Sequence, residues 1–221
     1  MRQIGLVGGT GDIGSALAVH LAKKYERVLV GSRDISRSKE SIGNILKEKP
    51  KVGKLADSLI AATNETVVSQ CDIVLLTVPY ASAIETIQKL EHNFRGDQLL
   101  ISTVASLTKT AREFLPNVKS RSISKSIQDL LPTLRVSCAF QTLPASILYN
   151  AESVDADVFV CCDHQDTFQE TAEVVTTVEG LRPLYAGTLD ISTEVEGLTA
   201  ILLNIAARNK LKSPTFKIRS F

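Results

Sequence analysis

Six residues near the N-terminus have the types and the spacing that bind the phosphates of a nucleotide. They read Gly9-Thr10-Gly11-Asp12-Ile13-Gly14 and fit the pattern G-x-G-x-x-G. The pattern is specific here because it follows a short apolar run and opens a segment of helical periodicity. We expect Gly9 to allow a tight turn, Gly11 to let the backbone approach a pyrophosphate, and Gly14 to let the helix pack closely. The helix N-terminus then presents free N–H groups and a positive dipole end to the phosphates.

The residues after the second apolar run indicate which nucleotide is bound. A site specific for NAD places Asp or Glu about twenty residues further on, where it binds the ribose hydroxyls. This chain has Gly31-Ser32-Arg33 there, and Arg37 and Lys39 follow. Without the carboxylate nothing repels a 2′-phosphate, and Arg33 can pair with that phosphate through two parallel hydrogen bonds. An ordinary solvated arginine is the alternative, but its position after the glycine pattern favours NADP(H).

Val78 and Pro79 end another strongly apolar run. In an open α/β sheet the ligand lies outside the carboxyl ends of the strands, so this turn is expected to line the nucleotide crevice. The alternative is that Pro79 only ends the strand.

The chain lacks side chains arranged for proton transfer or for metal binding. Tyr80 and Tyr149 have no Lys four residues later, so the Tyr-x-x-x-Lys proton donor is absent. Reduction of a carbonyl needs a proton donor, whereas hydride exchange between two planar redox cofactors needs mainly orientation. We therefore expect no catalytic acid or base. The cysteines and histidines show no metal-ligand spacing, so no metal is expected either; they are Cys71, Cys138, Cys161, Cys162, His20, His92 and His164.

Short apolar runs alternate with helical patterns along the chain, as in βαβ units. The runs lack period-two alternation, which indicates strands covered on both faces and therefore a parallel sheet. We expect strands at residues 4–7, 28–30, 59–61, 73–77, 99–102, 136–140, 158–162 and 182–185. We expect helices at residues 12–24, 38–49, 64–70 (with Asn64 as the cap), 81–90, 167–178 and 193–209. The predicted fold is α/β: a Rossmann-type, doubly wound, mainly parallel sheet with a small C-terminal α/β annex ending in a helix. Residues 1–142 form the predicted nucleotide-binding domain, and residues 143–221 form the smaller C-terminal part.

Composition excludes several classes of partner. The 221 residues carry a formal net charge of +1, contain no Trp and are 5% aromatic, which argues against binding to nucleic acid. No apolar stretch approaches the roughly 20 residues that span a bilayer, and the N-terminus leaves no room for a signal peptide. We expect a cytoplasmic protein that does not bind membranes.

The sequence resembles the deazaflavin-dependent NADP reductases, which pass hydride between NADPH and coenzyme F420. The resemblance spans nearly the whole chain. It rests on residues 8–14 and 30–33, on Cys71-Asp72-Ile73-Val74-Leu75-Leu76-Thr77-Val78-Pro79, on Thr142-Leu143-Pro144-Ala145, and on Leu198-Thr199 with Leu203-Asn204-Ile205. The most specific segment is Gly180-Leu181-Arg182-Pro183-Leu184-Tyr185-Ala186-Gly187.

The resemblance implies an oxidoreductase with NADP(H) and coenzyme F420 as its two coenzymes. It implies that NADP(H) is held by Gly9, Thr10, Gly11, Asp12, Ile13, Ser32, Arg33 and Arg37, with Val78, Pro79 and Val104 on the nicotinamide side. The deazaflavin ring would stack near Gln141, Leu143 and Pro144, and Thr199 of the last helix would line its pocket. The C-terminal part would close the hydride-transfer cleft. The family is dimeric, so a homodimer is expected.

The chain departs from the family at three places, all on the nicotinamide and deazaflavin side. Gln141 stands where the family has His. Where the family often has His in the helix after a Pro-Trp turn, this chain has Tyr80-Ala81-Ser82 after Pro79. Thr103-Val104 replaces the family's Pro-Leu. Gln141 can hydrogen-bond a ring carbonyl but carries no charge. Two alternatives therefore stay open: an NADPH-dependent flavin or ferric-chelate reductase, and a non-catalytic NADP(H)-binding sensor module.

Overall fold

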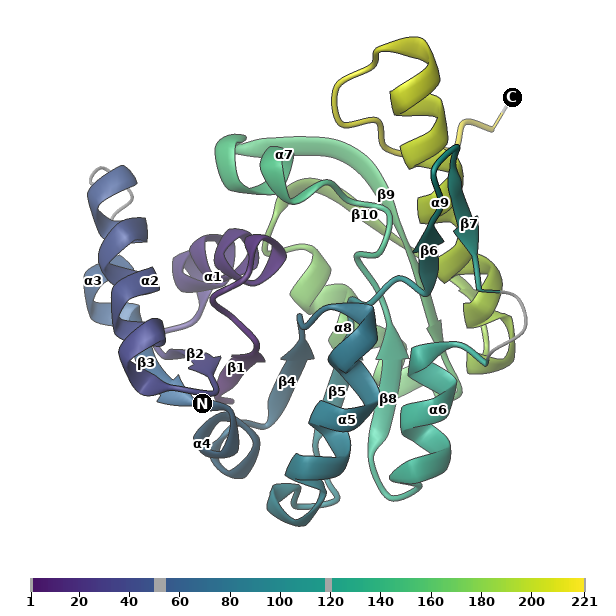
Figure 1. Cartoon of the computed structure of the whole chain (residues 1–221). Coiled ribbons are helices and arrows are strands. Elements are labelled where there is room, and N and C mark those ends of the chain that lie inside the picture. The colour runs from purple at the N-terminus through teal and green to yellow at the C-terminus, as the bar shows by residue number, and fades with distance from the viewer. Residues whose placement is uncertain (1, 50–54, 118–120, 221) are drawn as a thin grey trace.

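Eight strands form one twisted sheet in this computed structural model, which describes residues 2–49, 55–117 and 121–220 (Figure 1). The strand order is β10-β9-β8-β5-β4-β1-β2-β3. The strands are β1 (Ile4–Val7), β2 (Val28–Ser32), β3 (Leu59–Thr63), β4 (Ile73–Leu76), β5 (Leu99–Ser102), β8 (Arg135–Cys138), β9 (Ser153–Cys162) and β10 (Glu179–Gly187). Neighbouring strands are parallel except β8 and β9. The predicted mainly parallel, doubly wound sheet is confirmed.

Helices cover both faces of the sheet. One face carries α1 (Asp12–Lys24), α2 (Ile35–Glu48), α7 (Ala145–Asn150) and α8 (Gln165–Val175). The other carries α4 (Asn64–Gln70), α5 (Tyr80–Leu90) and α6 (Ile123–Leu130). The chain also forms α3 (Leu55–Ser58) and, as its last described helix, α9 (Ser192–Asn209). Of the described helices, none is both long and apolar enough to cross a membrane.

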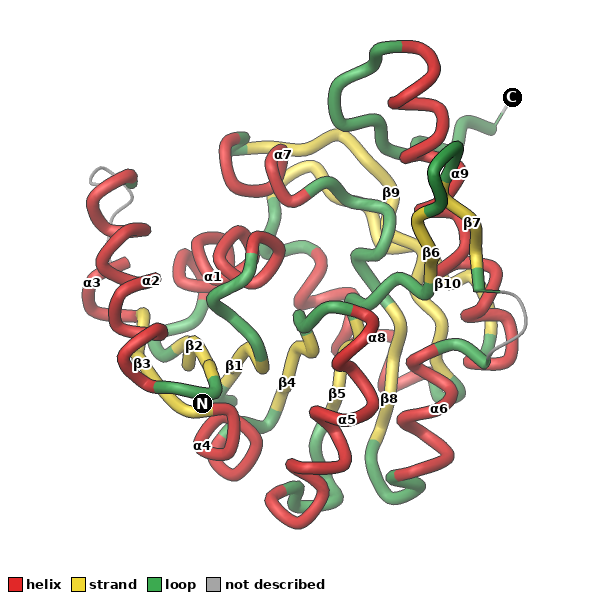
Figure 2. Tube along the Cα trace, in the orientation of Figure 1, coloured by secondary structure: helices red, strands yellow, loops and turns green. Residues whose placement is uncertain are grey.

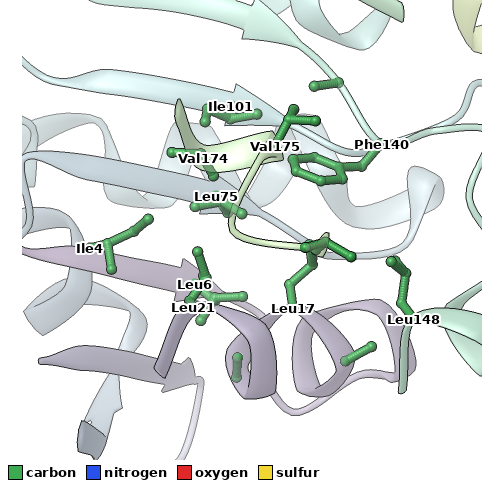
Figure 3. Packing of buried hydrophobic residues seen from close by; sticks show 14 of the residues in the cluster. Ile4, Leu6, Leu17, Leu21, Leu75, Ile101, Phe140, Leu148, Val174 and Val175 are labelled. Carbon is green, nitrogen blue, oxygen red and sulfur yellow. The ribbon is translucent and has the colours of Figure 1, made fainter. Parts of the chain in front are cut away.

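Successive residues of each central strand pack against opposite layers. In β1, Ile4 and Leu6 belong to the core beneath α1 and α8, whereas Val7 packs against α4 and α5. Figure 3 shows Leu6 and Leu75 of the sheet facing Leu17 and Leu21 of α1. Because both faces are buried, both sets of alternating positions must be apolar, which explains the unbroken apolar runs.

The structure differs from the expected elements in three respects. Asn64 does not cap α4; the Thr63 side chain does, accepting a hydrogen bond from the Thr66 amide at 3.2 Å. The hairpin of β6 (Leu107–Lys109) and β7 (Phe114–Pro116) and the helices α3, α6 and α7 were not predicted, because they are too short for a clear periodicity signal (Figure 2). The strands β9 and β10 extend the main sheet and are longer than the apolar runs that predicted them.

Candidate functional site

The glycine-rich turn joins β1 to α1 at the carboxyl edge of the sheet. Gly8, one residue before the motif, has the positive φ (76°) that the turn requires, and a Cβ there would lie 2.5 Å from Cγ1 of Val78. The turn therefore needs Gly8 for its backbone conformation, and Gly9 is packed closely as well, since a Cβ there would lie 3.0 Å from Cβ of Leu6 and from Cγ1 of Val30. Two hydrogen bonds tie the turn to neighbouring elements: Gly9 N donates to Gly31 O at 2.8 Å, and Gly8 N donates to Oδ1 of Asn64 at 3.1 Å.

The other glycines of the motif differ in what surrounds them. A Cβ on Gly14 would lie 2.6 Å from Cα of Gly9, so α1 packs directly on the turn and tolerates no side chain there. A Cβ on Gly11 would meet its nearest described atom, the Gly8 carbonyl oxygen, at 3.6 Å. The space beside Gly11 is thus open at the N-terminus of α1, where a phosphate can approach the backbone.

Four side chains link the carboxyl ends of successive strands; we call them the carboxyl-edge ladder. Oγ1 of Thr77 donates to Val7 O at 2.9 Å, and Oγ1 of Thr103 donates to Leu76 O at 3.0 Å. Nε2 of Gln141 donates to Ser102 O at 2.8 Å, and Oγ1 of Thr199 donates to Gln141 O at 2.9 Å. The ladder follows the spatial order β1, β4, β5, β8 and ends on α9. It fixes the segments that contain Val78, Val104 and Pro144.

The arginines predicted to bind a 2′-phosphate lie at the carboxyl end of β2. Arg33 and Arg37 are exposed, and neither guanidinium group forms a hydrogen bond or ion pair with the residues that the structure describes. Asp34, between them, caps α2 by accepting a hydrogen bond from the Ser36 amide at 2.9 Å, which lowers the pKa of its carboxyl. Ser32 is buried. The two guanidinium groups are thus available to an anion, and the carboxylate beside them is engaged at the helix N-terminus.

A cleft of about 620 Å³ lies beside the glycine-rich turn, between the N-terminal end of α1, α2 and α7. It brings together Thr10, Asp12 and Arg37, which the sequence predicted as cofactor-binding. The remaining lining residues are Ser15, Glu40, Ser41, Asn44, Ile45, Glu48, Ala145, Ser146, Tyr149 and Asn150. Of the residues predicted to bind NADP(H), only these three line the cleft, and α7 brings it next to the segment that follows Pro144.

Tyr149 closes this cleft on the α7 side. Its hydroxyl donates to Oε2 of Glu48 at 2.7 Å, and Nζ of Lys49 lies 4.7 Å from the ring centroid. Burial and then the hydrogen bond to Glu48 raise the pKa of Tyr149 to about 12. The phenol therefore stays protonated, and its proton is engaged in the hydrogen bond to Glu48.

The residues predicted to contact the deazaflavin ring gather at the end of the ladder, and two of them are deeply buried. Gln141 and Leu143 are each 6% exposed, whereas Pro144 and Thr199 are partly exposed. Phe140 precedes them with a positive φ of 72°, an uncommon conformation for a residue with a bulky side chain. Within the described residues, Oε1 of Gln141 has no hydrogen-bond partner. Since Nε2 already donates to Ser102, the open atom of this side chain is an acceptor.

Among the described residues, no group of three or more His, Cys, Asp or Glu side chains is placed to hold a metal ion. The cysteines Cys71, Cys138, Cys161 and Cys162 are free and buried. Burial raises the pKa of Cys71 to about 12 and that of Cys162 to about 11, so both thiols stay protonated.

Sequence reasoning missed the residues that support this site. Asn64, Thr77 and Thr103 hold the turn and the strand ends through hydrogen bonds to backbone groups. Each polar side chain directly follows a strand, and that position was the available signal. What the sequence lacked was the partner, which is a backbone atom of a different strand.

Comparisons with known proteins agree with the geometry. Residues 3–106 match the family model described as NADP oxidoreductase, coenzyme F420-dependent. The chain is 28% identical over 223 residues to the F420-dependent NADP reductase of Methanothermobacter thermautotrophicus, covering 99% of this chain and 95% of that protein. It is 27% identical to the F420-dependent NADP reductase of Methanocaldococcus jannaschii, covering 98% of this chain and 97% of that protein.

A solved structure from Arthrobacter sp. FB24 superposes on the whole fold with a TM-score of 0.78 at 20% identity, covering 100% of both chains. The fold, the glycine-rich turn and similarity along nearly the full length thus agree: the chain matches the family of coenzyme F420-dependent NADP oxidoreductases over residues 3–106 and is similar to F420-dependent NADP reductases from end to end.

Proposed function

We propose that the protein transfers a hydride between NADP(H) and coenzyme F420. The observation that carries this proposal is the glycine-rich turn, open at Gly11, in a chain that aligns almost end to end with F420-dependent NADP reductases. Both coenzymes are planar redox groups, and hydride passes between them when their rings are held in contact.

The phosphate side of the site favours NADP(H) over NAD(H). We infer that the turn over residues 9–14 binds the pyrophosphate through backbone N–H groups, and that Arg33 and Arg37 bind the 2′-phosphate. The support is that these guanidinium groups are exposed and have no partner among the described residues. An anion at this point meets two cations and the positive end of α2.

On the acceptor side the protein supplies position and no proton. We infer that Val78, Pro79 and Val104 line the nicotinamide and that Gln141, Leu143, Pro144 and Thr199 form the deazaflavin side. Leu143 is buried, so it would act by holding the backbone of this segment and not by stacking on the ring through an exposed face. Gln141 would accept a hydrogen bond from a ring N–H, because its amide nitrogen is already engaged with Ser102.

The test is to mix the protein with NADPH and oxidised coenzyme F420 and to follow the deazaflavin absorbance, with NADH and FMN in parallel. We expect rapid bleaching with NADPH and coenzyme F420 only. Turnover of FMN without turnover of coenzyme F420 would instead make the protein a flavin reductase. Tight NADPH binding without turnover of either acceptor would make it a sensor module.

Three further predictions belong to this function. We propose that residues 143–221 close the hydride-transfer cleft over the domain formed by residues 1–142.

We also propose a cytoplasmic homodimer. Among the apolar residues of α9, Val195 and Leu202 are buried in the monomer, whereas Ile201 and Ile205 are exposed, at 49% and 39%. Light scattering on the purified protein would determine whether this exposed face pairs two copies.

A further inference from the structure

Glu196 of α9 is a carboxylate in the interior of the protein. Its side chain is 0% exposed, and it forms no ion pair with a Lys or Arg of the described chain. A buried carboxylate without an opposite charge is rare, because removing it from water costs several kcal/mol unless hydrogen bonds replace the water. Such a residue persists when its hydrogen bonds organise the structure around it.

The hydrogen bonds to Glu196 come from the N-terminus of another helix. Oε2 accepts from the Ile123 amide at 3.1 Å, and Oε1 accepts from the amide and the hydroxyl of Ser124 at 3.3 and 3.2 Å. These amides belong to the first turn of α6, which has no intrahelical acceptors for them. The carboxylate therefore caps α6 from α9, and the dipole of α6 favours its negative charge.

A second contact beside it ties the same two helices. Oγ of Ser122 lies 2.5 Å from Oγ of Ser192, the first residue of α9, and also accepts from the Lys125 amide at 2.9 Å. Burial raises the pKa of Glu196 to about 7, while amides of Ile123, Ser124 and Ser106 counteract that shift. Glu196 thus lies where α6, α9 and the segment after Val104 meet.

This junction is close in the chain to the acceptor side of the site. Thr199 follows Glu196 by one helical turn and donates to the carbonyl of Gln141 at 2.9 Å. Gln141 lies in the turn from Phe140 to Leu143, where the Leu143 amide donates to Phe140 O at 3.1 Å. Figure 1 shows α6, α9 and the β6–β7 hairpin together at the β8 side of the sheet. Movement of α9 relative to α6 would therefore move Thr199 and release this turn.

We infer that Glu196 is a positioning residue: by capping α6 from α9 it holds Thr199 against Gln141, and so fixes the Phe140–Pro144 turn that faces the hydride acceptor. The role of this turn in acceptor binding rests on the proposed function. The geometry of the junction does not depend on the proposed function, so the positioning role of Glu196 and the function can be tested separately.

The experiment compares Glu196→Gln with a matched control. Gln has nearly the same shape and keeps one carbonyl oxygen for Ser124, but it turns an NH2 group toward the Ile123 amide, which is also a donor. The control is Leu90→Ala, at the end of α5 near the amino edge of the sheet, where a buried side chain is lost away from the junction. Two readouts are measured: hydrogen exchange of the Leu143 amide, and KM for coenzyme F420. The Kd for NADPH is measured as a reference for the other side of the site.

We expect Glu196→Gln to speed exchange at Leu143 about tenfold and to raise KM for coenzyme F420 about tenfold, the effect of losing one hydrogen bond to a charged group. The Kd for NADPH should change less than about twofold, since Arg33 and the glycine-rich turn lie across the sheet. Thr199→Val should reproduce both changes. Leu90→Ala should lower thermal stability and leave both readouts at their wild-type values.

Unchanged exchange at Leu143 in Glu196→Gln, or an equal change in Leu90→Ala, would show that the inference is wrong. An unchanged KM in an enzyme that turns over coenzyme F420 would do the same. If the wild type shows no turnover while exchange at Leu143 responds as expected, the positioning role stands and the proposed function fails.

Discussion

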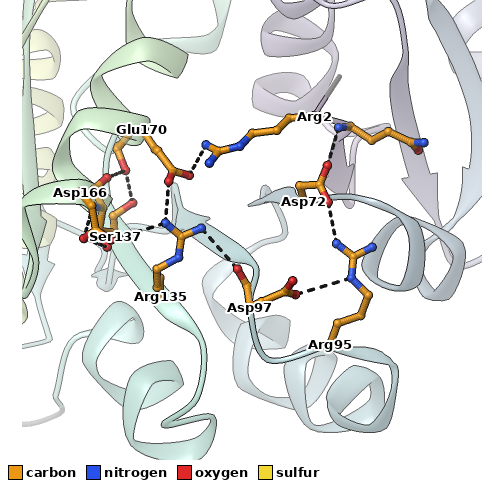
Figure 4. Close-up of polar contacts among 11 residues, drawn as sticks. Arg2, Asp72, Arg95, Asp97, Arg135, Ser137, Asp166 and Glu170 are labelled. Carbon is orange, nitrogen blue, oxygen red and sulfur yellow. Dashed lines mark hydrogen bonds and ion pairs between the residues drawn. The ribbon is translucent and has the colours of Figure 1, made fainter.

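The two edges of the sheet use their arginines differently. At the amino edge, Arg2 and Arg135 both pair with Glu170, at 2.7 and 2.6 Å, and Arg95 pairs with Asp72 at 2.7 Å (Figure 4). At the carboxyl edge, Arg33 and Arg37 meet no acceptor among the described residues.

This difference distinguishes the arginines that stabilise the fold from those that are free to bind a ligand. A guanidinium that is already paired gains little from an incoming phosphate, because it must first give up its carboxylate. One without a partner forms the new ion pair at no such cost. We therefore assign the amino edge to stability and the carboxyl edge to the ligand.

The sharpest test of this comparison is Arg33→Ala. We expect the Kd for NADPH to rise between about 100- and 1000-fold, or about 3–4 kcal/mol, because an ion pair with two charge-assisted hydrogen bonds is lost. Binding of NADH should change little, since NADH has no 2′-phosphate. Isothermal titration calorimetry with both nucleotides measures this, and the free energy of unfolding should stay within about 0.5 kcal/mol of wild type. An equal loss of affinity for NADH would contradict the assignment of Arg33.

The pH dependence of stability distinguishes the carboxylate of Asp72, at the amino edge of the sheet, from that of Glu196, at the junction of α6 and α9. Burial alone would raise the pKa of Asp72, but hydrogen bonds from the Gln3 amide and Arg95 hold it below its usual value. Burial raises the pKa of Glu196 from 4.5 to about 7. Between about pH 4.5 and 7, Glu196 therefore binds more protons in the folded protein than in the unfolded chain. Stability supplied by Glu196 falls as pH rises through this window, by up to about 3 kcal/mol, whereas stability supplied by Asp72 is lost as pH falls.

Urea unfolding of wild type and Glu196→Gln at several pH values isolates this effect. Other groups cancel in the difference, including His20, whose pKa burial lowers and which therefore destabilises the fold at acid pH. We expect the wild type to lose stability relative to the variant between about pH 4.5 and 7. A difference that does not depend on pH would contradict the raised pKa.

A pair of glycine substitutions separates folding from binding within the carboxyl edge. Gly14→Ala places a methyl group 2.6 Å from Cα of Gly9 and should lower the free energy of unfolding by about 2 kcal/mol. Gly11→Ala adds a methyl group in open space, so stability should change less than about 1 kcal/mol while NADPH binding weakens at least about tenfold. Denaturation and nucleotide titration of both variants check this. Normal NADPH affinity in Gly11→Ala would place the pyrophosphate elsewhere.

The smallest expected effect is at the amino edge. Arg135→Ala leaves Glu170 with Arg2 as its partner and should lower the free energy of unfolding by about 1 kcal/mol, because both side chains are partly exposed. Its Kd for NADPH should equal that of wild type. Chemical denaturation with NADPH titration tests both, and a nucleotide-binding defect here would break the division between the two edges.

Local residue chemistry predicted the strands of the main sheet and the phosphate side of the site. Unbroken apolar runs predicted the buried parallel strands, since strands covered on both faces need apolar residues at every position. The glycines before α1 and Arg33 after β2 predicted the nucleotide site, because their role depends on their own backbone and charge.

Contacts between distant segments were decided only by the tertiary structure. Asn64 supports the glycine-rich turn, Gln141 spans to Ser102, and Glu196 caps a helix that begins more than seventy residues earlier in the chain. None of these pairings has a periodicity, because a side chain meets a backbone group of another element. The acceptor side therefore follows from how α9 and β8 come together, and the sequence could name its residues only through resemblance.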